Sequence, residues 1–378
     1  MYKFFLYPYN IMIMFLFSLF ISTFELSEFY DSLSISDIFI LLICASMYAI
    51  QIPFLRKNVF LINDQNFSLK NQYKIFLLIS LLGSLLELVT VGLPIISGGG
   101  RDDYSGLPVV HVFFYSFSII SILYSSLYSS KKDVIFCTVM VLMLSIVWLS
   151  RQLMMVSFLI LLLSMVVRNR EKILPWGKIL AGIVGVLFLF GIVGNFRQKL
   201  AGDYVANYIL KIGGANSAGE KLGDVLYWIW LYLASPIYNL ILNINNFYNF
   251  GSRCNYAVYY GSCSGSYLSA VILPDTFVKY FSEEKFKLDL IISYLNVGTG
   301  YSEAARIMGL HGVGLQILLH GLFFFLGFKM MPIRAKNVFI VYYSALSIFM
   351  IFNNTFVKGE LFIVFVILFL MRFKFKSD

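Results

Sequence analysis

The residues best suited to chemistry are arginines that interrupt or follow long apolar segments. Ser150, Arg151 and Gln152 separate the two halves of the apolar stretch from Val134 to Val167. A guanidinium group stays charged at low dielectric and binds phosphate through two parallel hydrogen bonds. A charge between apolar segments is costly, which favours a functional role for Arg151. Four further arginines are candidates for the same chemistry, with solvated loop charge as the alternative: Arg101, Arg197, Arg253 and Arg306.

A second group of residues could accept a proton. Glu303 lies in the segment from Gly298 to Gly312, which also contains Arg306 and His311. A carboxylate or an imidazole can take the proton of a reacting hydroxyl when it lies within hydrogen-bond reach. The other role open to Glu303 is structural, as a carboxylate near a helix N-terminus that pairs with Arg306.

Other acidic residues also have two interpretations. Glu87 falls inside an apolar run, where a carboxylate must be protonated, paired or open to a cavity. His111 on the next run is its predicted structural partner, and a proton relay is the alternative. Asp102 and Asp103 follow a run of glycines, where they could bind a divalent cation or simply be solvated in a turn.

Motifs of common soluble enzymes are absent from the sequence. It contains no zinc-ligand spacing, Walker loop, Gly-x-Ser-x-Gly elbow or Gly-x-Gly-x-x-Gly segment after a strand. We therefore assign no metal and no cofactor. The net charge of +9 comes from short clusters of Lys and Arg between apolar runs, so nucleic acid is not an expected partner.

The composition indicates a protein whose solvent is lipid. Hydrophobic residues make up 59% of the 378 residues and charged residues 13%, about half the charged fraction of soluble domains. A transmembrane helix needs about 20 apolar residues. The sequence therefore predicts an all-α polytopic membrane protein of about ten transmembrane helices. The predicted spans are Phe4–Phe24, Ile38–Leu55, Ile75–Ile96, Leu107–Tyr124, Val134–Leu149, Leu153–Val167, Trp176–Val193, Gly312–Phe328, Val338–Phe352 and Leu361–Met371.

The stretch from Val134 to Val167 is read as two helices, because one helix of this length would be about 50 Å long, far more than a bilayer core of about 30 Å. Arg151 then lies at the tip of a helical hairpin, where its side chain can reach water or a ligand. Basic residues concentrate in the loops on the other side of the membrane, including both termini. Because cytoplasmic loops retain Lys and Arg, we expect both termini in the cytoplasm.

A long segment without strong charge bias divides the membrane spans. We expect residues 1–193 to form spans one to seven, residues 194–311 to form a large outer loop with short helices, and residues 312–378 to form the last three spans. Val225–Ile244 is apolar enough to cross, but one extra crossing would place the basic C-terminus outside. It is therefore predicted to be an interfacial or re-entrant helix broken at Pro236. Cys254 and Cys263 in the same loop could form a disulfide in an oxidising compartment.

The segment Gly298–Gly312, with Glu303 followed by Gly309 and Gly312 before a late span, resembles the O-antigen polymerase (Wzy) family of oligosaccharide repeat-unit polymerases. The Ser150–Gln152 hairpin tip before a Leu-rich helix, and the large outer loop after a span that ends near Arg197, fit the same family. An Arg-x10-Gly pattern of some members is absent after every outer arginine, so no loop mechanism is carried over.

The resemblance implies an enzyme of the cytoplasmic (inner) membrane that works at its periplasmic face. It would transfer a growing glycan from undecaprenyl diphosphate onto the non-reducing end of a new lipid-linked repeat unit, which would make O-antigen or capsular polysaccharide. Arg151 and Arg197 would stabilise the diphosphate, and Arg306 and Arg101 would help to bind it. Glu303 is the expected base or sugar ligand, and Asp102 and His311 are further candidates for that role. Expected partners are the lipid-linked oligosaccharide, membrane lipid and a chain-length regulator protein.

Three other functions compete with this one. A flippase for the same lipid-linked unit would need the same basic grip on diphosphate, but no pseudo-repeat is visible between the halves of the chain. An O-antigen ligase would share the donor and the layout and use a different acceptor. An integral acyltransferase would need an acyl-donor site, which the sequence does not show.

Overall fold

In the computed structural model, residues 2–62, 69, 71–92, 107, 109–148, 150–170, 176–200, 207–252, 267–280, 288–293, 295 and 298–374 are described. Within these residues every named element is a helix, apart from an isolated antiparallel bridge between Ser27 and Ala215. The all-α expectation is therefore confirmed.

The described part of the chain is a succession of helices. In chain order they are η1 (Tyr2–Phe5), α1 (Tyr9–Ser22), α2 (Ile35–Asn58), α3 (Gln72–Thr90), α5 (Val110–Tyr128), α6 (Lys131–Val147), α7 (Arg151–Arg168), α8 (Trp176–Leu200), α9 (Tyr208–Ile212), α10 (Ser217–Phe250), η3 (Leu268–Ile272), α12 (Asp275–Val278), α13 (Ser302–Met330), η4 (Ile333–Ala335), α14 (Lys336–Phe349), η5 (Thr355–Val357) and α15 (Gly359–Lys374).

Each predicted apolar run coincides with a helix. Among the described residues, six helices are long and apolar enough to cross a membrane, namely α2, α3, α5, α7, α10 and α13. The helices α1 and α15 are apolar but shorter. The long apolar helices carry many exposed large hydrophobic side chains, such as Phe39 on α2, Ile75 on α3 and Leu318 on α13. Such faces suit contact with lipid. The described part of the chain therefore has the fold of an all-α membrane protein.

The stretch from Val134 to Val167 forms two helices, as the length argument predicted. Ser130 begins α6, and its hydroxyl accepts a hydrogen bond from the backbone N–H of Asp133. Ser150 begins α7, and its hydroxyl accepts from the N–H of Leu153 at 3.2 Å. These N-caps satisfy donors that a helix leaves open in its first turn.

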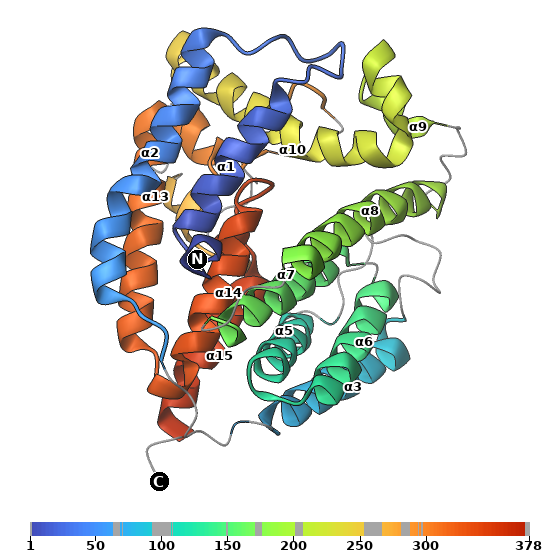
Figure 1. Cartoon of the computed structure of the whole chain (residues 1–378), viewed down its shortest axis with the longest axis vertical. Helices are drawn as coiled ribbons and strands as arrows, with labels where there is room; N and C mark the ends of the chain where they lie inside the picture. Colours follow the sequence, from blue (N-terminus) through green and yellow to red (C-terminus); the bar gives the residue numbers. More distant parts are fainter. Residues whose placement is uncertain are drawn as a thin grey trace.

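The helices form two packed groups (Figure 1). α3, α5 and α6 pack against one another, and α5 also contacts α7 and α15. On the other side α13 packs on α2 and α14, while α10 runs across the upper end of the molecule against α1 and α13. The largest hydrophobic core cluster joins α5, α7, α13 and α14, and includes Ile119, Ile160, Ile317 and Tyr343.

The helix α10 corrects one sequence prediction. Pro236 was expected to break it, yet α10 continues through this residue, and its one non-helical position is Gly223 with φ 73°. Contacts on either side of Pro236 hold the helix in place. Trp230 Nε1 donates to the carbonyl of Ile21 at 3.0 Å, and the Tyr238 hydroxyl donates to the carbonyl of Ser22 at 2.9 Å. Tertiary packing therefore outweighs the hydrogen bond that proline removes.

The late span also begins earlier than predicted. α13 starts at Ser302 and not near Gly312, and it bends at Met308 and Gly309. Gly309 has φ 59° and ψ −146°, a conformation that is essentially restricted to glycine. A Cβ at this position would also lie 2.6 Å from Cδ1 of Phe247 on α10. The bend thus lets α10 and α13 approach closely.

We predict that Gly309→Ala destabilises the protein, because it adds backbone strain of about 1–3 kcal/mol and a clash with Phe247. The thermal unfolding midpoint in detergent should fall by several degrees. Gly185→Ala in α8 is the matched control, because a Cβ there meets no atom within 4 Å. Equal unfolding midpoints for the two variants would contradict a strained bend at Gly309.

Candidate functional site

Arg151 is the first residue of α7, at the tip of the hairpin, and its side chain is half-buried. Its guanidinium carbon lies 6.0 Å from the ring centroid of Trp228 on α10, within the range of a cation–π interaction. The indole N–H of Trp228 donates to Oδ1 of Asn195 on α8 at 2.7 Å. Arg151 is therefore positioned where α7, α8 and α10 meet.

The hairpin tip is tied to its neighbours by polar contacts. The backbone N–H of Ser150 donates to the carbonyl of Ser145 at 2.8 Å, and the Ser150 hydroxyl lies 3.3 Å from the hydroxyl of Tyr115 on α5. The amide of Gln152 donates to Oε1 of Glu360 on α15 at 3.3 Å. These contacts fix the turn on which Arg151 is mounted.

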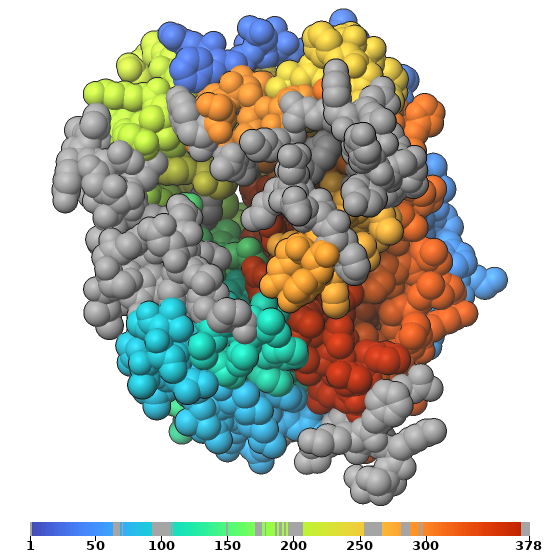
Figure 2. Space-filling view, turned by 180° about the vertical axis from the view of Figure 1, so that it is seen from behind, coloured from blue at the N-terminus to red at the C-terminus, as the bar shows by residue number. Residues whose placement is uncertain are grey.

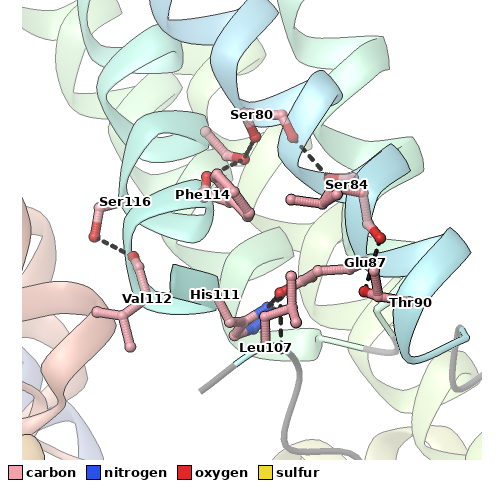
Figure 3. Close-up of polar contacts among 11 residues, drawn as sticks. Ser80, Ser84, Glu87, Thr90, Leu107, His111, Val112, Phe114 and Ser116 are labelled. Carbon is pink, nitrogen blue, oxygen red and sulfur yellow. Dashed lines mark hydrogen bonds and ion pairs between the residues drawn. The ribbon is translucent and has the colours of Figure 1, made fainter. Parts of the chain in front are cut away.

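Glu87 and His111 form the buried pair that the sequence pointed to (Figure 3). Glu87 is fully buried near the end of α3, and Nδ1 of His111 on α5 lies 2.9 Å from Oε1 and 3.0 Å from Oε2 of its carboxylate. The backbone N–H of Leu107 also donates to Oε1 at 3.2 Å. The carboxylate is thus satisfied by several donors, as a buried acid requires.

An aromatic layer joins this pair to the hairpin tip. The His111 ring meets Trp148 edge-on, with centroids 5.1 Å apart, and Tyr115 stacks on Trp148 at 6.0 Å. Tyr115 in turn reaches the Ser150 hydroxyl. A continuous set of contacts therefore runs from Glu87 to the residue that precedes Arg151. The indole nitrogen of Trp148 is buried and has no hydrogen-bond partner within the described part of the chain.

The elements around the tip border a hollow in the surface. Figure 2 shows this face, which is recessed between α5 and α7, coloured teal to green, and the segment 267–280 with α15, coloured orange to red. Tyr115, Arg151 and Glu360 are carried by α5, α7 and α15. The residues next to Arg151 at the hairpin tip therefore contact Tyr115 and Glu360.

Glu303 lies in the first turn of α13, near enough to Lys358 to interact with its charge. The pairing with Arg306 considered from the sequence is not formed, because Arg306 bonds elsewhere. Oε2 of Glu303 is buried and has no hydrogen-bond partner among the residues described. A buried acceptor without a donor is costly, so this oxygen is suited to receive a ligand hydroxyl.

Arg306 is buried, with 6% of its surface exposed, and is bound to protein acceptors. Its Nε donates to Oδ2 of Asp289 at 2.6 Å, and its Nη1 donates to the carbonyl of Gly251 at 2.7 Å. The same Asp289 oxygen accepts from the amide of Asn246 at 3.0 Å. The guanidinium is therefore committed to holding three segments of the chain together, which makes Arg306 a positioning residue.

A row of asparagines on α10, which sequence reasoning missed, supports this ion pair. Asn243 accepts from the N–H of Asp289 at 3.2 Å and donates to its carbonyl at 2.8 Å, and Asn239 accepts from the N–H of Ile291 at 3.0 Å. Asn239, Asn243 and Asn246 recur at helical spacing on an apolar helix. Such a row signals a polar strip that must find partners.

The remaining predicted residues are placed as follows. Arg197 lies in the last turn of α8, which continues beyond the predicted end at Val193, and its side chain is not among those described. His311 is exposed on α13 just after the bend. Arg101, Asp102, Asp103, Arg253, Cys254 and Cys263 lie outside the described residues. Arg151, Glu303 and Arg306 have separate sets of neighbours.

The described residues contain no group of three or more His, Cys, Asp or Glu side chains that could hold a metal ion. No protein-family model, curated protein or solved structure matches this chain. Over the described residues the fold is that of an all-helical membrane protein, and the candidate site places a half-buried arginine beside a tryptophan ring at the tip of a helical hairpin.

We predict that Arg306→Ala lowers stability, because it leaves the Asp289 carboxylate without its partner, at a cost of about 3 kcal/mol. The thermal unfolding midpoint in detergent should fall by about 4 °C. Arg151→Ala, which removes a half-buried arginine from the hairpin tip, should leave the midpoint within about 2 °C.

The double variant Arg306→Ala/Asp289→Ala tests the cause. Removing both charges should recover part of the loss, since no unpaired carboxylate remains. An Arg306→Ala protein that unfolds at the wild-type temperature would show that the ion pair is not structural.

Proposed function

We propose that this protein polymerises lipid-linked oligosaccharide repeat units at the outer face of the cytoplasmic membrane. The observation that carries the proposal is the placement of Arg151 at the fixed tip of a helical hairpin, beside the ring of Trp228. An arginine at this position suits a diphosphate headgroup presented at the membrane surface. Aromatic faces beside it suit sugar rings.

The proposed topology has ten spans, with both termini in the cytoplasm and a large outer loop between spans seven and eight. Residues 194–311 contain the end of α8 together with α9, α10, η3, α12 and the first part of α13. In this topology α10 does not cross the membrane, because a crossing would move Lys329, Arg334 and Lys336 outside. Its course across the upper end of the helices supports a position at the outer interface (Figure 1).

The proposed reaction is a glycosyl transfer. The acceptor hydroxyl oxygen forms a bond to the anomeric carbon of the growing glycan, and the bond from this carbon to the diphosphate oxygen breaks. The diphosphate leaves with the electron pair, and Arg151 stabilises its developing charge. The hydroxyl proton passes to a base, for which Glu303 offers an acceptor oxygen that has no donor among the residues described.

Supporting roles are proposed for further residues that the sequence singled out. Arg197 at the end of α8 and Arg101 are proposed to add positive charge for the diphosphate. His311 and Asp102 are alternative sugar ligands or bases. Trp148 offers an uncommitted indole N–H one layer below the hairpin tip. Glu87 and His111 hold this layer and are not proposed to touch the substrate.

We predict that Arg151→Ala lowers polymer formation by about 100-fold or more, because removing one stabiliser of developing charge costs roughly that factor. Purified protein in liposomes is supplied with undecaprenyl-diphosphate-linked repeat units, and the products are separated on a gel. Wild type should give a ladder of multiples of the repeat. Lys221→Ala, which removes an exposed positive charge from the same proposed side, should keep the ladder.

A second pair of variants tests Glu303 as the proposed general base. Glu303→Gln should reduce the ladder strongly, whereas Glu220→Gln, an exposed acid in the first turn of α10, should not. Full ladders from both Arg151→Ala and Glu303→Gln would overturn the proposed site. Movement of single repeat units across the bilayer without chain growth would indicate a flippase, and transfer onto lipid A core alone would indicate a ligase.

The topology makes an independent prediction. In a variant whose four cysteines are replaced by serine, Glu28→Cys should react with a membrane-impermeant maleimide in intact cells, because residue 28 is exposed on the outer side. Lys57→Cys, exposed at the end of α2, should react only after the cells are opened. The reverse labelling pattern would show that the orientation is inverted.

A further inference from the structure

A cavity of about 100 Å³ lies between the N-terminal segment and the end of α2. Its floor is apolar and consists of buried side chains, among them Leu6, Leu55, Phe324 and Ile340. These come from the residue after η1 and from α2, α13 and α14. The cavity is large enough for part of an acyl chain and too small for a whole lipid.

Two basic side chains line this cavity. Lys3 on η1 and Arg56 in the last turn of α2 are both exposed. Neither forms an ion pair or a side-chain hydrogen bond with any described residue. Arg168, in contrast, donates to the carbonyls of Ser126 and Ser129 at 3.0 and 3.2 Å. Lys3 and Arg56 are therefore available to an anion at the mouth of an apolar cavity.

The wall of the cavity is held by specific bonds. The hydroxyl of Tyr7 donates to Oε1 of Gln51 on α2 at 2.9 Å, and its backbone N–H donates to the hydroxyl of Ser344 on α14 at 3.0 Å. Asn10 donates to the carbonyl of Ser344 at 2.7 Å. The N-terminal segment is thus anchored to two helices, and Lys3 and Arg56 are kept on the same cavity.

The surroundings of the mouth suit a lipid–water interface. Tyr2, Tyr9 and Phe60 also line the cavity, and Phe60 is 62% exposed. Aromatic side chains of this kind concentrate where a bilayer meets water. In the proposed topology this mouth faces the cytoplasmic leaflet, whose anionic lipids attract basic residues.

We propose that this cavity binds one anionic phospholipid. The lipid phosphate lies between Lys3 and Arg56, and the upper part of an acyl chain enters the apolar floor. A zwitterionic lipid gains less from two unpaired cations, since its headgroup carries no net charge. The proposal rests on membrane embedding and on this cavity, and it is independent of the polymerase reaction.

The test uses the full-length protein in detergent with added phosphatidylglycerol or phosphatidylcholine, and native mass spectrometry counts bound lipid. Wild type should retain one phosphatidylglycerol in preference to phosphatidylcholine. In Lys3→Ala/Arg56→Ala the affinity for phosphatidylglycerol should fall about 25-fold, because each basic residue near a membrane surface contributes roughly fivefold. Lys57→Ala/Lys132→Ala is the control, because it loses the same charge from exposed residues that do not line the cavity.

A variant that leaves the charges intact separates the cavity from the surface charge. Ile52 lines the cavity and is half-buried, so Ile52→Trp should fill it and reduce retention of phosphatidylglycerol without a change in net charge. Equal losses in both double-alanine variants would overturn the proposal, as would undiminished retention in Ile52→Trp. Displacement of the lipid by millimolar inorganic phosphate would identify a site for free phosphate and would also overturn it.

Discussion

The turn at Ser150 is the constraint on which the proposed site depends. Its backbone N–H is bonded to Ser145, and its hydroxyl caps α7 through Leu153. Without this break, α6 and α7 would continue as one helix of about 57 Å, and Arg151 would lie near its middle. The break places Arg151 in the first turn of a new helix.

An arginine in this position needs a rigid support, because a mobile side chain would lose conformational entropy on binding an anion. This support is provided by α5, whose side chains form a series of polar and aromatic contacts from Glu87 to Ser150. The series begins with a fully buried carboxylate, and such a group persists only when its lone pairs are satisfied. Through these contacts Glu87 helps to fix the position of the hairpin tip.

The central position of α5 follows from its small polar residues. Ser121, Ser125 and Ser126 are buried, and their hydroxyls donate to backbone carbonyls of the preceding turn at 2.7–3.1 Å. Ser126 also donates to the hydroxyl of Ser164 on α7 at 2.8 Å, and Ser121 accepts from Sγ of Cys137 on α6 at 3.5 Å. These small side chains present little bulk and link α5 to its neighbours. In a lipid solvent, where apolar side chains gain nothing by leaving water, such close approach is a main source of helix association.

The sequence predicted the helices well because the relevant signal is local. Apolar runs define a helix in lipid whatever it packs against, so the ten runs and the break at Ser150 were found. The pairing of Glu87 with His111 was also predicted, since both lie on consecutive runs that turn back on each other. The count of spans and their orientation remain proposals that rest on charge distribution.

The features that escaped prediction depend on distant parts of the chain. The partner of Arg306 is Asp289, held by asparagines of α10, and no pattern within the segment Gly298–Gly312 reveals it. The continuation of α10 through Pro236 likewise depends on contacts with the end of α1. These are tertiary effects, and they outweigh the local preference of each residue.

Arg151 and Arg306, both assigned to the diphosphate from the sequence, show what the structure adds. Arg306 is buried, and its donors are directed at Asp289 and Gly251, so a substrate would have to displace strong charge-assisted bonds. Arg151 is half-buried beside the face of Trp228. A substrate anion that displaced Asp289 from Arg306 would leave that carboxylate without its charged partner, which is costly. Arg306 is therefore better suited to structural support than to substrate binding.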